Sequence, residues 1–125
     1  MAMTLLAIAV GAAVGAMLRF GLGSGLNHFA PNLPMGTLIA NLLGAFLMGM
    51  ALAAFLTIEI PATWRLFLTT GFLGGLTTFS TFSAEAFLLM QQGQTGAAVV
   101  HIVAHVAGSL ISTAAGFHLL RSLAP

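Results

Sequence analysis

Hydroxyl side chains alternate with phenylalanines in a short segment of the chain, which reads TTFSTFS at residues 77–83. Phe79 and Phe82 are three residues apart, so they share one face of a helix. Because an aromatic ring has a positive edge, ring edges beside uncharged hydroxyl donors can line a narrow path for an anion. Lipid contact or core packing is the alternative role for each ring. The candidate wall residues are Phe79, Ser80, Thr81, Phe82 and Ser83.

A second polar feature is a stripe that repeats every fourth residue near the C-terminus. Because the rest of that stretch is apolar, the stripe is expected to face either an ion path or a helix interface. Its two histidines are too few to form a metal site by themselves. The stripe consists of His101, His105, Ser109 and Thr113.

Three further polar residues stand in apolar surroundings. Asn41 lies mid-stretch, where its amide needs a partner; it either bonds another helix or donates its N–H groups to a dehydrated anion. Arg19 lies near a stretch end and either extends to the headgroups or attracts anions into a vestibule. Glu85 follows Phe82 by about one helical turn. Because a bare carboxylate repels an anion, we expect Glu85 to line a wider mouth or to pair with a cation.

Glycines accumulate just before the hydroxyl-rich segment. Glycine weakens a helix by about 1 kcal/mol relative to alanine, and a helix broken inside a membrane frees polar backbone groups that protein or a water-lined cavity must satisfy. Carbonyls at the end of a half-helix hold cations, and amides at the start of one face anions. We expect a break at residues 74–77; a flexible packing helix is the alternative. The glycines are Gly71, Gly74 and Gly75.

The elements that must position these residues are membrane-spanning helices. Of the 125 residues, 59% are hydrophobic and 4% are charged, whereas a soluble domain carries about a quarter charged residues. So few charges cannot build a water-facing surface, and the bilayer is the expected solvent. They also give no basis for a nucleic-acid partner. The absence of cysteine excludes disulfides and thiolate metal sites.

Four apolar stretches are each close to the roughly 20 residues that a membrane span needs. We expect them to form a single domain over residues 1–125, without a linker or an internal repeat. The expected location is the inner cell membrane, as a multi-pass protein. The predicted spans are residues 2–23, 33–57, 64–90 and 96–120.

The arginines give a weak orientation signal. With four spans, Arg65 and Arg121 lie on one side of the membrane and Arg19 lies on the other. The positive-inside rule needs a clear excess of Lys and Arg on one side, so we expect insertion in both orientations. Four short helices also leave little room for an internal path. Together these points favour a homodimer, and an antiparallel arrangement is the hypothesis.

Two segments resemble the motifs of the Fluc, or CrcB, fluoride channels. Residues 71–85, GFLGGLTTFSTFSAE, are similar to the family's signature segment, and residues 36–46, GTLIANLLGAF, are similar to its second-helix motif. Arg19 stands where these proteins carry an arginine at the end of the first helix. The resemblance covers essentially the whole chain, including its length and number of spans.

The resemblance implies an all-α integral membrane channel of four transmembrane helices, with the third broken mid-membrane, assembled as an antiparallel, dual-topology homodimer. Such proteins export fluoride passively and so reduce its toxicity in the cytoplasm. Asn41 would be the pore amide, with Phe79 and Phe82 as the pore-lining rings. A structural Na⁺, not itself transported, would lie on the two-fold axis. The backbone carbonyls of Gly74 and Thr77 from each subunit would hold it.

The chain departs from the family at His101 and His105, which occupy a place where the fourth-helix polar track often holds Tyr or Asn. The residues of that track that face the pore are therefore left open. Two other functions fit a short four-span chain. A small multidrug exporter depends on a glutamate in its first span, which this chain lacks, and a non-transporting subunit would carry no flux alone. No catalytic motif is present, so an enzyme is not expected.

Overall fold

The computed structural model describes residues 1–123, and this part of the chain is helical with short connections. Four helical segments are long and apolar enough to cross a membrane, which confirms the four predicted spans. The last helix begins one residue earlier and ends three later than expected. The elements are α1 (Ala2–Leu26), η1 (Asn27–Phe29), α2 (Met35–Thr57), α3 (Ala62–Leu66), η2 (Phe67–Leu73), α4 (Gly74–Leu76), α5 (Phe79–Gln91) and α6 (Thr95–Leu123).

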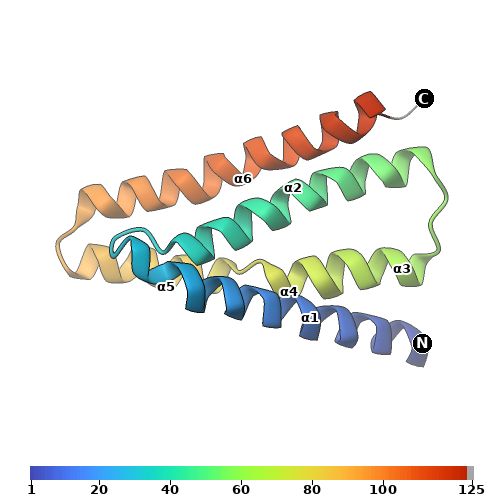
Figure 1. Cartoon of the computed structure of the whole chain (residues 1–125), viewed down its shortest axis with the longest axis horizontal. Helices are drawn as coiled ribbons and strands as arrows, with labels where there is room; N and C mark the ends of the chain where they lie inside the picture. The colour runs from blue at the N-terminus through green and yellow to red at the C-terminus, as the bar shows by residue number, and fades with distance from the viewer. Residues whose placement is uncertain (124–125) are drawn as a thin grey trace.

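The spans run alternately up and down, so the start of α1, the connection at 58–61 and the end of α6 lie at the same end of the molecule (Figure 1). α2 packs along α6, whereas α1 packs along η2 and α4. α5 lies against α6. The third span therefore lies between α1 on one side and the α2–α6 pair on the other for part of its length.

Glycines bring these pairs into backbone contact. A Cβ added at Gly15 of α1 would collide with the carbonyl oxygen of Phe72 in η2, and one added at Gly49 of α2 would collide with that of Thr113 in α6. Helices in lipid associate chiefly through such close packing, because lipid is as apolar as the side chains. Small-residue packing therefore explains these glycines without an ion site.

The third span is not one continuous α-helix. After α3 it widens into the π-helical η2, returns to α-helix in α4, and is extended at Thr77 (φ −88°, ψ 154°) and Thr78 (φ −150°, ψ 116°) before α5 begins. The sequence predicted loss of helix from Gly74 onward, but Gly74 and Gly75 are helical. A Cβ at Gly75 would collide with the carbonyl oxygen of Ala12, so this glycine serves the contact with α1.

Asn27 secures the connection between the first two spans. Its Oδ1 accepts hydrogen bonds from the backbone N–H groups of Gly36 (2.8 Å) and Thr37 (3.2 Å). These amides lie in the first turn of α2, where no intrahelical acceptor exists. The contact holds the start of α2, and with it the Thr37 side chain, in a defined place.

Candidate functional site

Asn41 on α2 contacts both the third span and α6 through its side-chain amide. Its Oδ1 accepts from the backbone N–H of Thr78 at 2.8 Å, and its Nδ2 donates to the carbonyl oxygen of Thr78 at 3.3 Å. The same Nδ2 lies 3.0 Å from Nδ1 of His105 on α6. Sequence reasoning offered two roles for this amide, and in this structure the interhelical one engages both N–H groups.

The contacts of Asn41 determine the tautomer of His105. The backbone N–H of Thr78 can only donate, so the atom facing it must be Oδ1. Nδ2 therefore faces the ring and donates to Nδ1 of His105. In a neutral imidazole with Nδ1 as acceptor, the proton is on Nε2. His105 thus presents an Nε2–H donor on the side of the ring away from Asn41.

The extended residues leave the carbonyls of residues 74–77 without their usual helical donors, because the first amides of α5 have no intrahelical acceptor. In a continuous helix the N–H of Thr78 would donate to Gly74 O, but here it donates to Asn41. Likewise the N–H of Thr81 donates to Oγ1 of Thr78 at 3.3 Å rather than to Thr77 O. The carbonyls of Gly74 and Thr77 are the two that the resemblance to the fluoride channels assigns to a cation.

Most hydroxyls of the segment after the interruption are used locally. Oγ1 of Thr78 caps α5 and also lies 3.1 Å from Oγ of Ser80 and 3.2 Å from Oγ1 of Thr81. Oγ of Ser83 donates to the carbonyl oxygen of Phe79 at 2.8 Å. The candidate path residues Ser80, Thr81 and Ser83 therefore support the start of α5, and their place along an ion path stays a prediction.

Phe79 and Phe82 share a face of α5, as their spacing predicts. Their ring centroids are 5.3 Å apart with an interplanar angle of 60°. Phe82 is 7% exposed and lies against the rings of His101 and His105, with centroid distances of 5.5 and 4.9 Å. Phe79 is 77% exposed. Most of the Phe79 ring is therefore free to contact lipid or another protein chain.

A cavity of about 490 Å³ brings most of the predicted path residues together. It lies between the third span, α2 and α6, and its walls are largely apolar with a few polar groups. Glu85, Arg19 and the hydroxyls of residues 80, 81 and 83 do not line it. The predicted residues that line it are Asn41, Gly74, Thr77, Phe79, Phe82, His105, Ser109 and Thr113.

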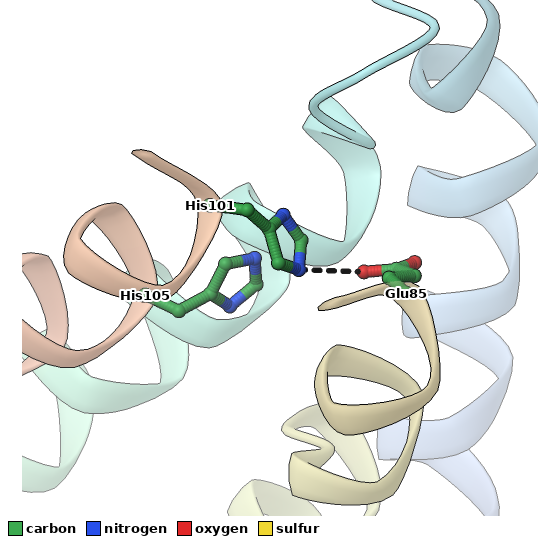
Figure 2. Close-up of side chains that lie close together, drawn as sticks. All are labelled: Glu85, His101 and His105. Atoms are coloured by element: carbon green, nitrogen blue, oxygen red, sulfur yellow. Dashed lines mark ion pairs between the residues drawn. The ribbon is translucent and has the colours of Figure 1, made fainter. Parts of the chain in front are cut away.

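The two charges assigned to vestibules lie apart from this cavity. Nε of Arg19 donates to the carbonyl oxygen of Gly75 at 3.0 Å, which ties α1 to α4 about two turns before α1 ends at Leu26. Oε1 of Glu85 accepts from Oγ1 of Thr37 at 2.8 Å, and its Oε2 lies 3.4 Å from Nε2 of His101 (Figure 2). The sequence offers a wider mouth or a cation partner as the surroundings of Glu85, and it specifies neither Thr37 nor His101, because both meet Glu85 through tertiary packing.

Glu85 also lines a second, smaller cavity of about 180 Å³, together with the connection before α2 and the last turns of α5. Glu85 therefore lines a cavity near the end of the helical bundle where the first two spans are connected. The vestibule roles of Arg19 and Glu85 stay predictions.

Comparison of the sequence with known proteins shows the family of this chain. The family model described as "CrcB-like protein, Camphor Resistance (CrcB)" matches residues 6–117. The chain belongs to the CrcB family. The resemblance seen in the second and third spans is thereby confirmed, and the chain is a multi-pass membrane protein of this family.

Curated relatives cover the CrcB-family chain almost end to end. A protein of Pectobacterium carotovorum is 50% identical over 118 residues, 94% of this chain and 93% of its own length. One from Chromobacterium violaceum is 54% identical over 114 residues, 90% of each chain. One from Chromohalobacter salexigens is 54% identical over 122 residues, 97% of this chain and 92% of its own. Each is named "Fluoride-specific ion channel FluC", so the family is one of ion channels and not of enzymes, as the sequence predicted.

Proposed function

We propose that this chain is a fluoride-specific ion channel, through which fluoride leaves the cell passively so that its concentration in the cytoplasm stays low. The observation that carries the proposal is the cavity in which Asn41, Phe79, Phe82 and His105 meet. The names of the relatives indicate which anion.

Fluoride is small and strongly hydrated, so a narrow path must replace its water with other donors. Uncharged donors and ring edges do this without trapping the ion, and conduction needs both easy entry and easy exit. The ring edges of Phe79 and Phe82 would supply such contacts, and Ser109 and Thr113 add polar groups to the largely apolar wall. Asn41 would give fluoride one N–H in place of its longer bond, the 3.3 Å contact to Thr78 O.

The functional unit in this proposal is an antiparallel, dual-topology homodimer in the inner membrane. Phe79 lines the cavity yet is 77% exposed, so a second copy is needed to close the path on that side. The weak bias of two arginines against one supports insertion in both orientations. Arg19 and Glu85 would then lie toward the two mouths of the path.

A structural Na⁺, not transported, completes the proposal. The carbonyls of Gly74 and Thr77 have lost their helical donors to Asn41 and Thr78, and both residues line the cavity. Carbonyl oxygens suit a hard cation. Two such carbonyls from each subunit would hold the ion where the interrupted third spans meet, and the interruption would lie at mid-membrane.

Fluoride efflux from liposomes, followed with a fluoride electrode, tests the proposed activity. Purified protein should release trapped fluoride far faster than empty liposomes, and it should release chloride no faster than empty liposomes. A monodisperse, folded protein that releases no fluoride with Na⁺ on both sides would overturn the channel function and favour a non-transporting subunit.

Reporter fusions test the dual topology separately. A C-terminal reporter that is active only in the cytoplasm and one active only outside it should both give signal. Signal from a single side would contradict the antiparallel dimer while leaving the flux result unaffected.

A further inference from the structure

Glu85, His101 and His105 converge at the contact between α5 and α6 (Figure 2). Each offers one ligand atom, and these atoms all lie within 4.8 Å of one another. Glu85 approaches from α5 and the two histidines from α6. Two histidines alone are too few to hold a metal, and the tertiary structure adds a third ligand from another helix.

The cluster holds buried polar atoms that the rest of the protein leaves unsatisfied. His101 is 0% exposed and His105 is 4% exposed. Within residues 1–123, Nδ1 of His101 and Nε2 of His105 are buried without a hydrogen-bond partner, and the buried atoms Oε2 of Glu85 and Nε2 of His101 have only their 3.4 Å contact with each other. Buried polar groups without a partner are costly, and such groups require an explanation. A shared ligand would satisfy an atom of all three residues at once.

The ligand types and spacing select a class of ion. Histidines at i and i+4 on one helix face are the arrangement by which helices present two zinc ligands. Two imidazoles and a carboxylate suit Zn²⁺ and similar divalent transition metals, whereas Mg²⁺ and Ca²⁺ prefer oxygen ligands alone. We propose that Glu85, His101 and His105 form a binding site for a divalent transition-metal ion of this class.

The cluster lies between the two cavities, which gives an ion a route in. Glu85 lines the smaller cavity near the start of α2, and His105 lines the larger one. His101 contacts both partners, at 3.4 Å from Glu85 and with its ring centroid 4.4 Å from that of His105. An ion entering past Glu85 therefore meets the two rings next.

Metal binding competes with the contacts that hold Thr78. With Nδ1 of His105 accepting from Asn41, the ring proton is on Nε2, so a metal at Nε2 requires the proton on Nδ1. Asn41 must then turn its oxygen toward the ring, as carboxylates and carbonyls do behind metal-bound histidines. The N–H of Thr78 thereby loses its acceptor. A bound ion would thus disturb the interrupted segment of the third span.

Zn²⁺ titration of the purified, metal-stripped wild-type protein by calorimetry tests the site directly. We expect one ion per chain, and Co²⁺ in its place should show the strong visible bands of low-coordinate cobalt. An absence of binding by the wild-type protein, or cobalt bands of a six-coordinate aqua ion only, would overturn the proposal.

Variants locate the site. His101→Gln and Glu85→Gln should each weaken Zn²⁺ binding roughly tenfold or more and abolish the cobalt bands. The matched controls are His118→Gln, an exposed histidine on the same helix, and Glu59→Gln, an exposed glutamate between spans. Equal affinity in the cluster variants and the controls would overturn the assignment. Should one cluster variant fail to fold, the other decides.

A flux measurement adds a consequence that rests on the proposed channel function. Zn²⁺ should slow fluoride efflux through His118→Gln and leave efflux through His101→Gln unchanged. Binding without this inhibition would contradict the competition with Thr78, whereas a protein with no flux at all would contradict the channel function and not the metal site.

Discussion

Asn41 and Thr78 are joined by both of the backbone groups of Thr78, whose N–H donates at 2.8 Å and whose carbonyl accepts at 3.3 Å. The Asn41 side chain therefore pairs the backbone N–H and C=O groups of Thr78, which a continuous helix would otherwise pair. It allows the third span to be extended at one point while its polar backbone groups remain paired, which lipid surroundings demand.

Replacing Asn41 by Leu should destabilise the fold. Both backbone groups of Thr78 would lose their partner, at about 1–3 kcal/mol for each group that stays unpaired. Denaturant unfolding in detergent measures the difference. Asn32→Leu, in the exposed connection before α2, is the control. Similar stabilities for the two variants would show that Asn41 does not hold the extended segment.

Phe79→Ile and Phe82→Ile should both reduce fluoride efflux, and they should differ in stability. Loss of one ring-edge contact of about 1.4 kcal/mol corresponds to a roughly tenfold lower rate. Phe82 is buried against two histidines and Phe79 is exposed, so only Phe82→Ile should also lower the free energy of unfolding. Phe87→Ile, at another exposed site of α5, is the control. Unchanged efflux in both test variants would rule out the ring-edge mechanism.

Gly15→Ala and Gly21→Ala form a matched pair on α1. A Cβ at Gly15 would collide with backbone atoms of Phe72 and Leu76, whereas nothing lies within 4 Å of one at Gly21. We expect the first to destabilise the protein by about 1–3 kcal/mol. The second should stabilise it by about 0.5–1 kcal/mol, because alanine favours the helix. Thermal unfolding in detergent compares the two, and equal shifts would contradict the packing of α1 on η2.

Exchanging Na⁺ for a large organic cation should lower both efflux and thermal stability. A ligand that binds only the folded state stabilises it by about 2.7 kcal/mol at a hundred times its dissociation constant. The carbonyls of Gly74 and Thr77 are the expected ligands, so the effect should persist in Asn32→Leu and weaken in Asn41→Leu, where the segment is no longer held. Equal efflux and equal thermal stability in the two salts would rule out a structural Na⁺.

The sequence by itself determined that the protein lies in a membrane, where its four spans are, and to which family it belongs. These follow from local properties, namely apolar stretches of membrane-spanning length and two motifs read in order along the chain. The shared face of Phe79 and Phe82 also follows, because helical spacing determines it. The convergence of the predicted path residues on one cavity agrees with the sequence, while their roles in conduction stay predictions.

Only the tertiary structure decided which polar groups meet. The extended residues are Thr77 and Thr78 rather than the glycines before them, because Gly75 is needed for contact with Ala12 and Asn41 supplies the bonds that an extended residue lacks. The two partners of Glu85 come from two other helices, Thr37 from α2 and His101 from α6. Packing across the whole molecule sets the rotation of each helix and the distance between helix backbones. The spacing of residues along one helix specifies neither.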